Sequence, residues 1–142
     1  MQLDMGMARV SSHGRGCMGS NLLLPEIGFQ GVPQPGQVVA FLLANALPST
    51  LGAAAIGFDN RTPFPIDLTP LGMGTCLQYF AIDSVVFAVT DGVGAASSPP
   101  IVVPNTSSLV GVNAYAQWVC ADAAATALGF TTSNYVRVQI GN

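Results

Sequence analysis

Apolar residues in this chain occur in short runs of five to seven, and turn-forming residues separate one run from the next. Runs rich in β-branched and aromatic residues, bounded by Gly, Pro, Asn, Asp and Ser, are typical of β-strands. The 16 glycines and 10 prolines between the runs leave no uninterrupted window for a long amphipathic helix. The predicted strands are residues 38–43, 53–58, 76–82, 85–90, 108–112, 114–120 and 136–140.

The pattern contains one short helical candidate, at residues 122–128. Asp122 can cap its first turn and Gly129 can end it after one or two turns. Seven short strands in 142 residues predict an all-β fold, an antiparallel β-sandwich of the jelly-roll or immunoglobulin-like kind. The length is that of one domain. We therefore expect a single β-sandwich domain at residues 11–142, preceded by an N-terminal strand or extension at residues 1–10.

The N-terminal extension has a pattern of its own. Met1, Leu3, Met5 and Met7 alternate with smaller or polar residues, and this period of two gives a strand one apolar face. The Gly-rich stretch at residues 11–20 would act as a flexible linker and let the segment reach beyond its own domain. The strand then either docks on its own sheet or pairs with a neighbouring copy of the chain. In the second case these four residues are subunit contacts.

The composition implies a surface poor in charge. Charged residues make up 8% of the chain and apolar residues 50%, with a mean hydropathy of +0.51. No apolar run approaches the roughly 20 residues of a membrane span, so no such span is expected. Lysine is absent, and four arginines at a net charge of −3 do not provide the basic face that nucleic-acid binding needs.

A surface carried by Ser, Thr, Asn, Gln and Gly, with one Glu in the whole chain, is typical of an exported protein. We therefore expect an extracellular or cell-surface location. Residues 1–15 contain neither the cationic start nor the apolar run of a signal peptide. Export would then rely on a leader removed upstream, or on a longer precursor of which this chain is part.

The three cysteines are 59 and 44 residues apart, which is not the spacing of a zinc site. Cys17 and Cys76 lie beside glycines in turn-like contexts, whereas Cys120 ends an apolar run. In an exported chain this pattern predicts a disulfide between Cys17 and Cys76. Cys120 is then either a buried, unreactive thiol or one half of a bond between subunits.

Residues that carry catalysis are sparse. Residues 14–19 match the GxGxxG pattern, but no buried strand precedes them and Pro25 follows too soon for a phosphate-binding helix. His13 is the only histidine, and no GxSxG motif accompanies it. The aspartates at predicted turns lack the spacing of a calcium loop and the pairing of a glycosidase. We expect no catalytic residue, no cofactor, no metal and a non-enzymatic role.

Two Asn-x-Ser/Thr sequences fall at predicted turns. Asn60 and Asn105 are therefore candidate glycosylation sites. A sugar coat would help to keep so weakly charged a surface in solution. In a bacterial product the same two residues serve as plain turn formers.

Short Gly, Pro and Cys patterns run in a fixed order from Gly14 to Gly141. They are residues 16–20, Pro33 with Gly36 before Phe41, residues 55–57, 65–68, 76–77 and 101–104, Gln117, residues 133–134 and residues 140–141. In this order the chain resembles a C-terminal β-rich domain of large secreted proteins of planctomycete-type bacteria. The resemblance implies export, a β-rich fold and two turn cysteines at the places of Cys17 and Cys76. It implies no catalytic residues, and Cys120 falls where the family commonly has another residue.

Two functions remain in competition. The first is a structural subunit of an extracellular assembly, such as a fibre, tube or sheath, formed by copies of the chain. The alternative is a secreted module that binds a polysaccharide or another surface within a larger exported protein. Carbohydrate modules display aromatic platforms, whereas most aromatic residues here, including Trp118, lie in predicted strands. The shortage of charge favours the assembly, because contact with copies buries apolar surface.

Overall fold

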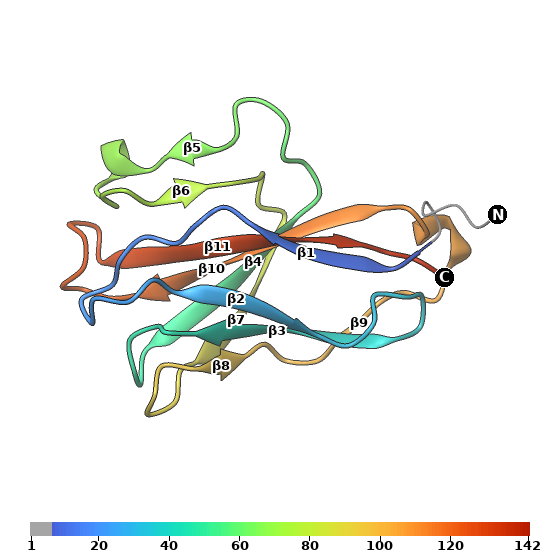
Figure 1. Ribbon diagram of the computed structural model, residues 1–142, viewed down its shortest axis with the longest axis horizontal. Helices are drawn as coiled ribbons and strands as arrows, with labels where there is room; N and C mark the ends of the chain where they lie inside the picture. The colour runs from blue at the N-terminus through green and yellow to red at the C-terminus, as the bar shows by residue number, and fades with distance from the viewer. Residues whose placement is uncertain (1–6) are drawn as a thin grey trace.

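Five antiparallel strands form the larger of two facing sheets (Figure 1). In the computed structural model, which describes residues 7–142, their order is β1-β11-β10-β4-β7. The two longest, β10 and β11, pair with each other through a hairpin and lie at the centre of the order. The bounds are β1 Arg9–His13, β4 Leu51–Gly57, β7 Ser84–Val89, β10 Asn113–Ala121 and β11 Phe130–Gln139.

The smaller sheet has the order β2-β3-β8, and β9 pairs with the other end of β3. A third, two-stranded sheet joins β5 and β6, which lie apart from the two main layers (Figure 1). The predicted all-β, antiparallel sandwich is confirmed. The bounds are β2 Glu26–Gln30, β3 Val38–Ala44, β5 Ile66–Asp67, β6 Leu77–Gln78, β8 Ala96–Ser97 and β9 Ile101–Val102, with 3-10 turns η2 Thr69–Leu71 and η3 Ser107–Leu109.

The main core lies between the two sheets. Side chains alternate between the faces of a strand, so Ala116, Trp118 and Cys120 of β10 point inward together, where Phe41 and Leu43 of β3 meet them. Trp118 is 0% exposed, which confirms its prediction as a core residue. Tyr115, Gln117 and Val119 therefore belong to the outer face of the larger sheet.

Two predicted elements are wrong. Residues 108–112 form no strand, because η3 and a turn that ends at Gly111, with a φ of 90°, bend the chain there. Residues 122–128 form turns rather than a helix. The side chain of Asp122 accepts a 2.8 Å hydrogen bond from the main-chain N–H of Ser20 and is not used to cap a helix. The hydroxyl of Thr126 instead accepts the N–H groups of Gly129 and Phe130, both at 3.1 Å.

Other boundaries shift. The predicted strand at residues 76–82 is reduced to β6, and β2 forms without having been predicted. The strand predicted at residues 1–10 overlaps β1, which begins at Arg9. Residues 11–13, expected within a flexible linker, belong to β1 and pair with β11 of the same chain. Gly28 interrupts the apolar pattern of β2, which conceals this strand in the sequence.

The predicted N-terminal contact residues lie largely beyond what the structure describes. Met1, Leu3 and Met5 fall outside residues 7–142, and Met7 is 45% exposed. Ala8 approaches the main chain of Gly141 so closely that a Cβ at Gly141 would lie 1.8 Å from the Ala8 nitrogen. The described start and end of the chain thus lie together, beside the β1–β11 pair. Within the described residues, no helix has the length and apolar character that a membrane crossing needs.

Candidate functional site

Residues 58–82, which connect β4 to β7, form a lobe over the outer face of the larger sheet (Figure 1). Tyr79 and Phe80 of this lobe pack against Ala55 of β4 and Tyr115 of β10. At the base of the lobe, a Cβ on Gly57 would lie 1.8 Å from the carbonyl oxygen of Ala81, so only glycine permits this approach. The lobe therefore covers one part of the outer face and leaves the rest uncovered.

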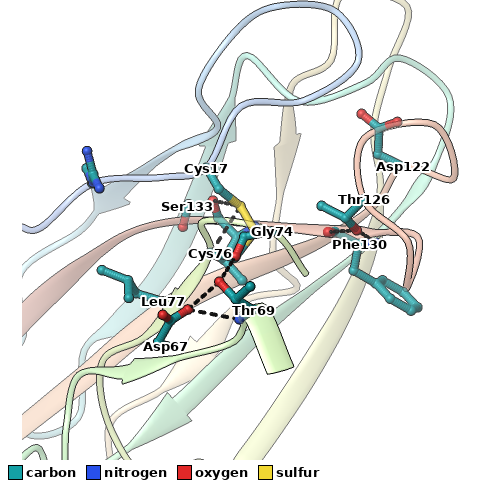
Figure 2. Close-up of a disulfide and its surroundings, with 12 residues drawn as sticks. Cys17, Asp67, Thr69, Gly74, Cys76, Leu77, Asp122, Thr126, Phe130 and Ser133 are labelled. Atoms are coloured by element: carbon teal, nitrogen blue, oxygen red, sulfur yellow. Dashed lines mark hydrogen bonds between the residues drawn. A yellow bond between two sulfur atoms is a disulfide. The ribbon is translucent and has the colours of Figure 1, made fainter. Parts of the chain in front are cut away.

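The disulfide between Cys17 and Cys76 joins the lobe to the segment that precedes β2, as predicted (Figure 2). The two Cα atoms are 4.9 Å apart. Both cysteines are buried, and Leu68 and Met73 pack with them in a small core of the lobe. The main-chain N–H of Cys17 donates a 3.0 Å hydrogen bond to the carbonyl oxygen of Thr132 in β11. The disulfide thereby fixes the lobe against β11 as well.

Beside the lobe, the outer face of β4 and β7 carries a row of exposed apolar side chains. Val89 pairs with Leu51 across β7 and β4, and Ala121 pairs with Phe130 across β10 and β11. Because Gly52 of β4 pairs with Cys120 of β10, the register places Leu51 next to Ala121. One row of side chains therefore crosses β7, β4, β10 and β11, and it consists of Val89, Leu51, Ala121 and Phe130. We call this surface the apolar face; its exposed members are Leu51 (51%), Val85 (43%), Phe87 (57%), Val89 (67%) and Phe130 (40%).

The apolar face ends at a sheet edge. β7 is the last strand in the order, and its sequence from Ser84 to Val89 contains no charged residue, glycine or proline. Proteins usually protect such edges with charges, prolines, bulges or very short strands. The edges elsewhere in the described sheets follow that rule, since β1 carries Arg9, β2 begins with Glu26 and β8 has two residues.

The opposite part of the same outer face is polar. Arg137 and Gln139 of β11 and Arg9 and Ser11 of β1 border a surface depression of about 500 Å³. The Arg137 guanidinium donates a 3.3 Å hydrogen bond to the side-chain oxygen of Asn113. The larger sheet therefore has an apolar edge at β7 and a polar edge at β1.

An aromatic stack adjoins the polar depression. The rings of His13 and Tyr135 stack with centroids 5.5 Å apart, and Tyr135 meets Tyr79 of the lobe at 4.6 Å. Partial burial raises the pKa of the Tyr135 hydroxyl, and the nearby Tyr115 adds to this shift. The stack thus joins β1 and β11 to the lobe.

Ser11 and His13 bring a hydroxyl group and an imidazole together on β1. The Ser11 hydroxyl lies 2.7 Å from Nε2 of His13, but both side chains are exposed and the histidine ring stacks on Tyr135. A nucleophile and base usually also need a third group that orients the base. Among residues 7–142, no three His, Cys, Asp or Glu side chains gather as they would around a metal ion.

Two groups have strongly shifted pKa values for structural reasons. The Arg61 guanidinium donates two hydrogen bonds, of 2.9 and 3.1 Å, to the Asp59 carboxylate and lowers the pKa of Asp59 to about 2. Burial raises the pKa of the Cys120 thiol to about 12, which is the opposite of thiol activation. Cys120 is a buried free cysteine, which agrees with the first of the two predictions for this residue.

The two candidate glycosylation sites differ in exposure. Asn60 is half-buried and Asn105 is exposed, and their glycosylation stays a prediction.

Comparison with known proteins found no matching family model, no matching curated protein and no matching solved structure. Sequence reasoning missed the apolar face because the run from Val85 to Val89 has no polar alternation and resembles a strand buried on both faces. Only Val86 and Ala88 of this run pack on the main core.

Proposed function

We propose that the chain is a non-enzymatic structural subunit of an extracellular assembly, in which copies of the chain associate through the apolar face. The observation that carries the proposal is the row of Val85, Phe87 and Val89 on an unprotected edge strand. Full burial of one such side chain is worth about 1.5–3 kcal/mol. Burial against a second copy would remove this surface from water without placing any charge in the contact.

The edge geometry suggests how two copies meet. Two β7 strands pairing antiparallel about a two-fold axis would satisfy each other's outward main-chain groups and place the two apolar faces side by side. The contact is self-complementary, because Val85, Phe87 and Val89 of one copy lie beside the same row of the other. The larger sheet would then continue from one subunit into the next.

An open-ended fibre, tube or sheath needs a second contact. The predicted N-terminal contact through Met1, Leu3, Met5 and Met7 precedes β1, which lies at the opposite edge of the larger sheet from β7. Contacts at two opposite edges allow subunits to add without closing the structure. Deletion of residues 1–6 should leave β7-mediated dimers and abolish longer assemblies. Unchanged assemblies after that deletion would contradict the N-terminal contact.

The disulfide supports an extracellular location for the proposed assembly. Disulfides form and persist in oxidising compartments and are rare in the cytosol. The bond between Cys17 and Cys76 supports a protein that works outside the cell or on its surface. Light scattering and negative-stain microscopy of the oxidised protein test the proposal. Regular multimers are expected, whereas a monomer that persists at high concentration would contradict it.

A second function, binding of a polysaccharide or another surface as a module of a larger exported protein, is supported by the polar edge. The depression bordered by Ser11, Arg137 and Gln139 offers hydrogen-bond donors and acceptors, and the stack of His13 on Tyr135 lies beside it. Aromatic rings beside polar groups suit the faces and hydroxyls of a sugar. A glycan array with the wild-type chain and Tyr135→Ala tests this function. Selective binding lost in the variant would support it, and no binding would exclude it.

A further inference from the structure

An apolar pocket opens between the two main sheets. It lies at the end of the sandwich where β9 pairs with β3; Figure 1 shows the position of β9. Its volume is about 140 Å³. It is separate from the apolar face, because its walls are the inward sides of the sheets. Ile56, Ala114 and Val138 line it from the larger sheet, and Phe29, Val39 and Phe41 line it from the smaller one.

The pocket follows from a small residue at a position where a large one would fit. Ala114 pairs with Val138, and both face the smaller sheet. Two positions further along β10 is Ala116, and the next inward position holds Trp118, which is fully buried and fills the centre of the sandwich. The Ala114 side chain ends at Cβ, so the sheets enclose space beside it. At the rim, the ring of Phe58 is 56% exposed.

The chemistry of the lining restricts the ligand. Every residue around the pocket is apolar, and the loops at its mouth contribute Pro33 and Pro104. A sugar or a charged group that entered would lose its hydrogen bonds to water without replacement, at a cost of about 1–3 kcal/mol for each polar group. A cavity of about 150 Å³ lined by Leu, Ile and Phe is large enough to bind benzene.

We propose that this pocket binds a single aromatic ring, as a monocyclic aromatic compound or the aryl end of a larger small molecule. The rings of Phe29 and Phe41, with centroids 5.6 Å apart in an edge-on arrangement, form one wall. An entering ring can pack against this pair by edge-to-face contact. The proposal is independent of self-association, because the apolar face and the pocket lie on opposite sides of the larger sheet.

The test is titration of the full chain with toluene, followed by methyl chemical shifts in NMR spectra. Saturable shifts are expected at Ile56 and Val138. Ala114→Leu places a larger side chain in the pocket and should weaken binding at least tenfold. Ala124→Leu makes the same substitution in the exposed turn after the same strand and should leave binding unchanged. Ile56→Phe fills the pocket from the neighbouring strand β4, so the test stands even if Ala114→Leu fails to fold.

Three outcomes would overturn the proposal. One is the absence of saturable shifts up to the solubility limit of toluene. Another is toluene binding that Ala114→Leu and Ile56→Phe leave unchanged. The third is a set of methyl shifts centred on Val85 and Val89, which would assign the binding to the apolar face instead.

Discussion

The indole N–H of Trp118 in β10 donates a 2.9 Å hydrogen bond to the main-chain carbonyl oxygen of Leu42 in β3. The bond crosses the core and joins the two sheets of the sandwich. The main-chain N–H of Trp118 donates a 2.9 Å hydrogen bond to the hydroxyl oxygen of Ser133, beside the irregular register between β10 and β11. One residue therefore fixes both the separation of the sheets and the local geometry of the central hairpin.

Replacement of Trp118 should be among the most destabilising changes in the chain. Trp118→Ala removes the largest fully buried side chain, and we expect a loss of about 3–5 kcal/mol in the free energy of unfolding. Trp118→Phe keeps a ring but leaves the Leu42 carbonyl without its donor, at a cost of about 1–3 kcal/mol plus the lost volume. Urea denaturation measures both. Equal stability of Trp118→Phe and the wild type would contradict the role of the hydrogen bond.

The disulfide should hold the lobe on the larger sheet. The bond closes a loop of 59 residues, and its removal in the Cys17→Ser and Cys76→Ser double variant should cost about 4 kcal/mol in the chain-entropy model. Amide exchange should become faster first in residues 58–82. Mass spectrometry of non-reduced peptides provides the control and should recover Cys17 linked to Cys76. A linkage that involves Cys120 would contradict this arrangement.

Cys120 should not react in the folded protein. Burial raises the pKa of its thiol to about 12, so the reactive thiolate is negligible near neutral pH. Iodoacetamide at pH 8 should label the thiol in urea and leave the native chain unmodified. Equal labelling rates with and without urea would show that the thiol is accessible. A Cys120–Cys120 bond between copies would instead favour the other prediction made for this residue.

The ion pair of Asp59 and Arg61 should lower the midpoint of the Asp59 carboxyl group in an acid titration. Because the pKa of Asp59 falls from its ordinary value of 3.8 to about 2 in the folded chain, the pair stabilises the fold above pH 4. This contribution is lost as the pH falls from about 4 to about 2, and it is small because both side chains are exposed. NMR titration of the carboxyl carbon should give a midpoint near 2. Arg61→Gln should return the midpoint toward 3.8.

Local pattern was enough to predict the fold class, the pairing of Cys17 with Cys76 and the burial of Trp118. These features depend on strand periodicity, turn context and residue size, which are local in the sequence. The helix expected to begin at Asp122 does not form, because the carboxylate binds the N–H of Ser20, which lies 102 residues away. No local pattern contains that contact.

The candidate surfaces depend on neighbours that the sequence does not show. Phe87 lies in an apolar run that does not alternate with polar residues. Only the register with β4 shows that the outer face of this run is exposed to solvent. The pocket beside Ala114 likewise depends on which side chains of the smaller sheet lie opposite this small residue. Sequence reasoning assigned such residues to a core, because apolar runs in small domains are usually buried.

Sedimentation velocity of the oxidised chain over a range of concentrations tests the central claim, self-association through the apolar face, most directly. The wild type should form dimers and larger species. Phe87→Lys should associate more weakly and retain only the N-terminal contact, because a charge at the centre of the β7 contact would be buried beside its copy. Val93→Lys is the matched control, since Val93 is 79% exposed in the turn after β7 and lies off the apolar face. It should associate like the wild type. A wild-type chain that sediments as a monomer throughout, or a Phe87→Lys chain that associates as strongly as the wild type, would contradict the account.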